Sequence, residues 1–142
     1  MKANANVILD TSPLVAFIDK GDNFHNWVRE TWKNLAIPLF TCEAVISEAC
    51  FLLQRTHGGQ DAVMSMLEAG VITIPLHLDD EIGTIRELMK RYQNVPMSFA
   101  DACLVRMSEL IAGSCVLTLD RDFLVYRQNK NQMIDLIIPA QL

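Results

Sequence analysis

The sequence predicts an α/β fold of three layers, in which helices cover both faces of a central, mainly parallel sheet of about five strands. Short apolar runs without alternation, at residues 7–9, 115–119 and 134–138, are typical of strands buried on both faces. Helical segments separate the predicted strands, which favours parallel pairing. The length of 142 residues fits one domain with its own core. We therefore expect residues 1–142 to form a single domain.

The N-terminal half alternates strands with helices. After the strand at 7–9, Thr11 or Ser12 can cap a helix that has Pro13 in its first turn. Thr41 can cap another helix, which is expected to run to about residue 55 before the Gly-Gly pair. The remaining predicted elements of this half are helices at 23–35 and 60–68 and strands at 38–40 and 71–74.

The C-terminal half begins with a strongly amphipathic helix at 79–92. Its acidic start and basic end suit the helix dipole. Its apolar side chains fall along one face, at Ile82, Ile85, Leu88 and Tyr92. Ser98 then begins a helix that reaches about residue 112, followed by the last two strands, at 115–119 and 134–138.

Charge and hydropathy exclude several classes of protein. The net charge of −5 argues against a protein that holds nucleic acid on a basic surface. Two bound divalent cations would bring that formal charge to −1, so the acidity disfavours a passive RNA-binding module more than it disfavours a metal-dependent nuclease. No apolar run is long enough to span a membrane. The first apolar run ends at Asp10, so no secretory signal is predicted and a cytoplasmic protein is expected.

The four cysteines lie singly within apolar segments, without the CxxC spacing of many metal sites. We expect Cys42, Cys50, Cys103 and Cys115 to be buried, reduced thiols rather than a disulfide framework or a zinc site. A slight excess of apolar residues over a typical domain favours apolar surface kept for a dimer or partner contact.

Glu48 is the carboxylate with the fewest local partners. Its neighbours at helical spacing are Ala44, Val45, Phe51 and Leu52, and its own helix offers no basic residue. A carboxylate in such a place must find a partner elsewhere, ligate a metal, or raise its pKa. A solvated edge position or an ion pair to another helix would also satisfy it.

Four aspartates are the other candidate ligands. Asp10 directly follows a predicted strand, and the next helix has other residues available as its cap. Asp120 also follows a strand, although Asp120 and Asp122 could simply form a turn. Asp101 stands three residues after Ser98, so it could belong to a capping box or ligate a metal. The carboxyl ends of parallel strands share one sheet edge, and hard oxygen ligands gathered there suit Mg²⁺ or Mn²⁺.

These residues stand in motifs that resemble those of PIN-domain proteins, specifically the VapC-type toxin ribonucleases of toxin–antitoxin pairs. Asp10 in Val-Ile-Leu-Asp-Thr-Ser-Pro resembles the first acidic motif, and Glu48 in Ile-Ser-Glu-Ala-Cys the second. Asp101 in Ser-Phe-Ala-Asp-Ala resembles the third. Asp120 in Leu-Thr-Leu-Asp-Arg-Asp-Phe resembles the fourth, with Asp122 as an extra or substitute ligand. The motifs follow in the family's order over nearly the whole chain.

The resemblance implies a three-layer PIN-like fold, a homodimer, and RNA cleavage that depends on Mg²⁺ or Mn²⁺. It also implies an antitoxin protein that blocks the site. Asp10, Glu48, Asp101 and Asp120 would be catalytic, with Glu48 ligating the metal or orienting a water. The alternative is a non-catalytic PIN module that binds RNA or a protein partner.

Three further residues belong to the predicted site. Ser12 and Thr118 resemble the small hydroxyl residues that support the acids in this family. Arg121, inside the fourth motif, is the best candidate for a contact with substrate phosphate. A phosphotransferase of the haloacid dehalogenase type would need an aspartate where Ser12 stands, which disfavours that reading.

Overall fold

The computed structural model of the chain describes residues 5–142, and its centre is a five-stranded sheet. Every pair of neighbouring strands in this sheet is parallel. The strands, in the spatial order β3-β2-β1-β4-β7, are Ile72–Thr73, Leu39–Phe40, Val7–Leu9, Cys115–Leu117 and Leu136–Ile137.

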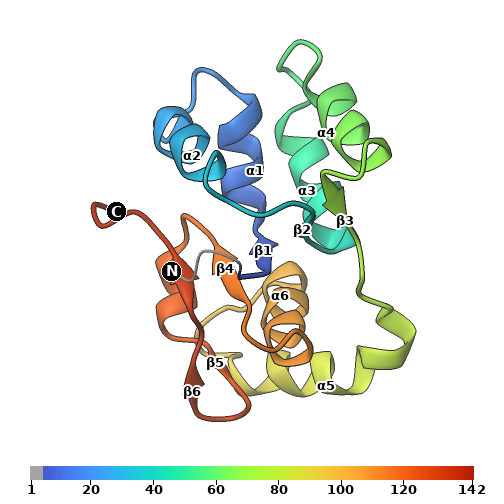
Figure 1. Cartoon of the computed structure of the whole chain (residues 1–142). Coiled ribbons are helices and arrows are strands. Elements are labelled where there is room, and N and C mark those ends of the chain that lie inside the picture. The colour runs from blue at the N-terminus through green and yellow to red at the C-terminus, as the bar shows by residue number, and fades with distance from the viewer. Residues whose placement is uncertain (1–4) are drawn as a thin grey trace.

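Helices cover both sides of the sheet. Figure 1 shows α1 to α4 on one side of the strands and α5 and α6 on the other. They are α1 (Thr11–Ile18), α2 (His25–Trp32), α3 (Glu43–Leu52), α4 (Gly59–Glu68), α5 (Leu78–Arg91) and α6 (Phe99–Leu110). The predicted three-layer α/β fold with a mainly parallel sheet is confirmed. No helix within residues 5–142 is both long and apolar enough to cross a membrane.

The centre of the sheet is fully buried, as the unbroken apolar runs predicted. In β1, Ile8 pairs with Phe40 of β2 on one side and with Val116 of β4 on the other. The pairing continues one residue past β1, because the amide of Asp10 donates to the carbonyl of Leu117 at 3.0 Å. Asp10 is thereby fixed at the carboxyl edge of the central strands.

Two predicted helix caps are wrong. Neither Thr11 nor Ser12 caps α1; Asp10 does, because its Oδ1 accepts a hydrogen bond of 2.7 Å from the Thr11 amide. Cys42, not Thr41, precedes α3. Thr41 is drawn instead toward the sheet, where its hydroxyl donates to a carbonyl of β1 at 2.7 Å. Ser98 caps α6 as predicted.

Other differences concern the extent of elements and the segment after β4. The helix predicted at 23–35 is shorter in the structure, where α2 covers His25–Trp32. Ile82, which was predicted to lie on the apolar face of α5, is 52% exposed. A short 3₁₀ helix, η1 (Arg121–Leu124), and a hairpin of β5 (Arg127–Gln128) and β6 (Gln132–Met133) were not predicted. The hairpin lies beside α6, as Figure 1 shows for β5.

Candidate active site

A cavity of about 480 Å³ opens at the carboxyl ends of β1 and β4. It brings together all five carboxylates that the sequence singled out, although they come from four separate parts of the chain. Ser12 and Arg121 also line it, whereas Thr118 lies buried behind it. Its lining residues are Asp10, Thr11, Ser12, Glu48, Leu52, Pro96, Ser98, Asp101, Leu119, Asp120, Arg121 and Asp122.

Asp10 is the most buried carboxylate of the cavity, at 6% exposure. Its Oδ1 accepts from the Thr11 amide and its Oδ2 from the Thr118 hydroxyl, both at 2.7 Å. Burial raises the pKa of Asp10 to about 7, even though both hydrogen bonds favour the charged form. The negative charges of Asp101 and Asp120 act in the same direction as burial. Asp10 is therefore held rigidly in a place that disfavours its charge.

Thr118 joins two of the aspartates. Its hydroxyl donates to Asp10 and accepts a hydrogen bond of 2.9 Å from the Asp120 amide. Asp120 in turn caps η1, because its Oδ1 accepts from the Asp122 amide at 2.8 Å. The turn that the sequence left as an alternative for Asp120 is present, yet the same residue lines the cavity.

Asp101 likewise caps a helix and faces the cavity. Its amide donates to the Ser98 hydroxyl at 3.0 Å, and its Oδ2 accepts from the Ser98 amide at 3.4 Å, which completes a capping box. Oδ2 also accepts a hydrogen bond of 3.0 Å from the hydroxyl of Tyr126. Burial is the main cause that raises the pKa of Asp101. Both of these hydrogen bonds to the Asp101 carboxylate fall on Oδ2.

Tyr126 is a site residue that sequence reasoning missed. It is fully buried and packs edge-on against Tyr92 and Phe123, with ring centroids 5.2 Å apart in both pairs. Burial, followed by the charge of Asp101, raises its pKa, so its hydroxyl stays protonated and donates. No local pattern signals this contact, because it depends on where the chain after η1 returns to α6.

Glu48 faces the same cavity from α3, but it is exposed. The predicted apolar face around it is only partly buried, since Phe51 and Leu52 are 65% and 53% exposed. Within the described part of the chain, no basic side chain forms an ion pair with Glu48. Partial burial and the charge of Asp101 raise its pKa.

The donor set of this cavity fits a hydrated divalent cation. Arg121 is the one basic side chain among the described lining residues, so several carboxylates face one another with little compensating charge. Carboxylate oxygens are hard ligands that suit Mg²⁺ and Mn²⁺. Within residues 5–142 the acids do not close into a group of three that could hold an ion by itself. An ion here would complete its coordination with water and phosphate oxygens, as Mg²⁺ commonly does.

A comparison with protein families adds to this geometry. Residues 7–129 match the model of the PIN domain. The chain belongs to the PIN-domain family. The match spans most of the chain and contains all five carboxylates of the cavity, so the resemblance inferred from the four acidic motifs is confirmed.

Two relatives of this PIN domain are of the VapC type, as the motifs predicted. Ribonuclease VapC26 of Mycobacterium tuberculosis is 29% identical over 118 residues, which cover 81% of this chain and 87% of the relative. The crystal structure of M. tuberculosis VapC20, described as a Sarcin-Ricin loop cleaving toxin, superposes with a TM-score of 0.70 at 23% identity. That match covers 82% of this chain and 92% of the VapC20 chain, and it supports the fold.

Proposed function

We propose that this PIN domain is a divalent-metal-dependent endoribonuclease, the toxin of a toxin–antitoxin pair, that hydrolyses RNA phosphodiester bonds. The observation that carries the proposal is the convergence of Asp10, Glu48, Asp101 and Asp120 on one cavity at the carboxyl edge of a parallel sheet. Membership of the PIN family and the ribonuclease named among its relatives support the same activity. Mg²⁺ or Mn²⁺ is the cofactor that this oxygen donor set favours.

The roles of the side chains in this proposal follow from their hydrogen bonds and their exposure. Asp10, Asp101 and Asp120 are fixed by hydrogen bonds and would hold the metal ion. A bound divalent ion supplies positive charge to the scissile phosphate and makes water a stronger nucleophile at neutral pH. Glu48, exposed and with a raised pKa, orients the attacking water and accepts its proton. Arg121 at the rim binds a phosphate oxygen of the RNA.

The remaining predicted residues have supporting roles. Thr118 sets the spacing of Asp10 and Asp120 through its two hydrogen bonds. Ser12 is half-buried in the cavity wall, where its hydroxyl can bind a water near Asp10. Asp122 is exposed at the rim and serves as an additional ligand beside Asp120.

Incubation with a total RNA pool tests the proposal. The wild-type protein should cut RNA with Mn²⁺ or Mg²⁺ and not with EDTA. Asp10→Asn and Asp101→Asn should each lose cleavage while melting no lower than wild type, because each change removes a crowded negative charge. Asp135→Asn, which changes an exposed aspartate outside the cavity, should leave cleavage intact.

Two outcomes would contradict this assignment. A folded Asp10→Asn variant with full activity would show that the cavity is not the catalytic site. A wild-type protein that binds RNA but has no affinity for Mn²⁺ and makes no cuts would instead be the non-catalytic PIN module.

We also propose an antitoxin partner, a homodimer and a cytoplasmic location. Exposed Phe51 and Leu52 beside Glu48 offer an apolar surface that an antitoxin segment can cover while it blocks the cavity. Co-purification with the product of a neighbouring small reading frame tests for the antitoxin. Light scattering of the protein alone and of the complex tests for the homodimer. The free state of all four cysteines supports a reducing compartment.

A further inference from the structure

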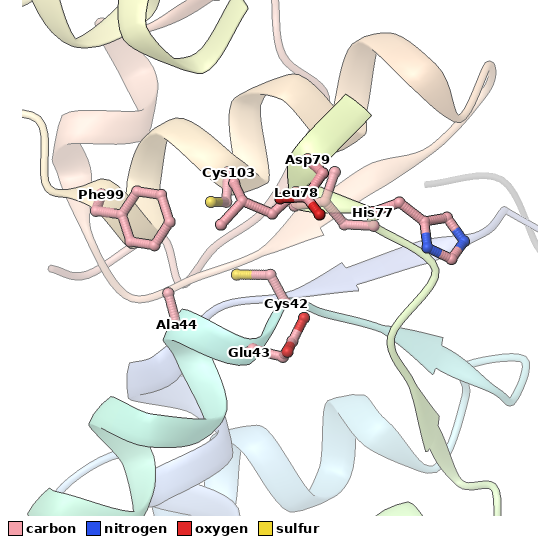
Figure 2. A pocket seen from close by; sticks show the side chains of 9 residues that line it. Cys42, Glu43, Ala44, His77, Leu78, Asp79, Phe99 and Cys103 are labelled. Atoms are coloured by element: carbon pink, nitrogen blue, oxygen red, sulfur yellow. The ribbon is translucent and has the colours of Figure 1, made fainter. Parts of the chain in front are cut away.

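A second cavity, of about 390 Å³, lies between the start of α3, the residues that lead into α5, and α6. It shares no lining residue with the carboxylate cavity. Figure 2 shows the sulfur atoms of Cys42, from the start of α3, and Cys103, from α6, pointing into this space. The exposed residues Glu43, His77 and Asp79 line the same cavity, so it is open to small polar solutes.

The two thiols interact with each other. Cys42 is the residue that precedes the first turn of α3, and Cys103 of α6 lines the same cavity beside it. The neighbouring Cys103 thiol is the largest cause that lowers the pKa of Cys42, against the effect of burial, which raises it. A thiol at a helix N-terminus beside a second thiol is the arrangement in which cysteines become reactive nucleophiles.

The other two cysteines provide a contrast within the same chain. Cys50 is half-buried on α3 and Cys115 is buried in β4, and neither lines this cavity. Burial raises the pKa of Cys115, which makes its thiol less reactive. If exposure alone decided reactivity, Cys50 would react first, because Cys42 and Cys103 are only 2% and 1% exposed.

We propose that Cys42 and Cys103 form a dithiol site that hydrogen peroxide oxidises reversibly to a disulfide, with Cys42 as the nucleophile and Cys103 as the resolving thiol. The sulfur of Cys42 attacks one peroxide oxygen, so that an S–O bond forms, the O–O bond breaks and water leaves. The sulfur of Cys103 then attacks the sulfur of Cys42, an S–S bond forms, and the hydroxyl leaves with the Cys103 proton as water. Two thiols are oxidised and one peroxide is reduced to two waters.

This inference goes beyond the proposed ribonuclease activity, and its test needs neither RNA nor metal. The full chain is treated with hydrogen peroxide in EDTA and analysed by intact mass and by peptide mapping without reduction. The expected result is the loss of two hydrogens, one linked peptide pair containing Cys42 and Cys103, and reversal by dithiothreitol. Cys50→Ser and Cys115→Ser are the matched controls and should oxidise at the wild-type rate.

Single variants assign the two roles. Cys103→Ser should accumulate a sulfenic acid on Cys42, trapped as its dimedone adduct. In the Cys42→Ser variant, Cys103 should oxidise about tenfold or more slowly than Cys42 does in the wild-type protein, because Cys103 lacks the helix N-terminus that activates Cys42. Phenylarsine oxide, which bridges paired thiols, should bind the wild-type protein and neither variant.

The proposal is overturned if Cys50 oxidises first, if the linked peptides contain Cys50 or Cys115, or if Cys42 survives peroxide that modifies the others. The wild-type peptide map decides the question even if a variant fails to fold. A protein that forms this disulfide but cuts no RNA would refute the proposed function alone.

Discussion

Asp10 has three structural roles, one through its backbone amide and two through its carboxylate. It continues the pairing of β1, caps α1 through Oδ1 and accepts from Thr118 through Oδ2, while it also faces the cavity. An asparagine has nearly the same shape, keeps an oxygen for the Thr11 amide and lacks the charge that burial disfavours. Asp10→Asn therefore removes the charge and keeps the cap of α1, while its amide NH₂ replaces the oxygen that accepts from Thr118.

Tyr126 offers a test of how Asp101 is positioned. Tyr126→Phe removes the hydroxyl that holds Asp101 Oδ2 at 3.0 Å and keeps the packing of the ring. Loss of such a partner behind a ligand typically weakens metal affinity by about 10–100-fold. We expect that loss in a Mn²⁺ titration, with little change in the far-ultraviolet circular dichroism spectrum.

Tyr92→Phe is the matched control for that change. Tyr92 belongs to the same aromatic cluster, but its hydroxyl accepts from the Arg127 amide and contacts no carboxylate of the cavity. Its variant should bind Mn²⁺ as wild type does. Equal affinities for wild type and Tyr126→Phe would show that the capping box alone positions Asp101.

Local sequence patterns were sufficient to identify the carboxylates of the cavity, but they did not identify the side chains that position those carboxylates. Asp10 and Asp120 were placed by the rule that parallel strands end at one edge. Glu48 was found because its helix offers it no partner, although its face is more exposed than expected. The bond from Tyr126 to Asp101 joins distant parts of the chain, so only the folded structure reveals it.

In α6, Asp101 belongs to the capping box of the helix and also lines the cavity. Ser98→Ala deletes the hydroxyl that caps α6 but leaves the contact between Tyr126 and Asp101 in place. Loss of an N-cap hydroxyl typically costs about 1 kcal/mol of the free energy of unfolding. Denaturant unfolding should show that loss, while Mn²⁺ affinity falls less than in Tyr126→Phe. If Ser98→Ala loses Mn²⁺ binding as fully as Asp101→Asn, the two roles are inseparable.

The elements that were predicted correctly are those whose side chains form the hydrophobic core. β1 and β4 are fully buried and apolar, whereas β5 and β6 are two-residue strands of largely polar side chains. Their hairpin turns through positive φ at Asn129 (49°) and Lys130 (71°), without the glycine that usually signals such a turn. The aromatic packing of Tyr126 before β5 helps to hold this segment.

Gathering acids at one edge of the sheet makes the metal-free fold sensitive to pH. The pKa of Asp10 is about 7 in the folded protein against an ordinary value of 3.8. Between those values the unfolded chain releases the proton that the folded chain keeps, so folding becomes less favourable as pH rises. The raised pKa values of Glu48 and Asp101 act in the same direction. The contribution of Asp10 is at most about 4 kcal/mol.

Thermal melting in EDTA checks this expectation. Wild type should melt at a higher temperature at pH 5 than at pH 8, and Asp10→Asn should reduce the difference. Saturating Mn²⁺ should raise the melting temperature most at pH 8, where the carboxylates are charged. An EDTA-treated protein that melts higher at pH 8 would contradict the effect of burial on Asp10.

Because Asp10 is buried and has a raised pKa, the binding of a metal ion in the cavity is coupled to the release of a proton. Near pH 6.5 most molecules carry a proton on Asp10, and a divalent ion must displace it, so binding releases about one proton into the buffer. Calorimetry in buffers of different ionisation enthalpy would count that proton, and the count should fall toward zero at pH 8. Metal occupancy then follows acidity as well as metal concentration, so acidification would empty the cavity before it unfolds the protein.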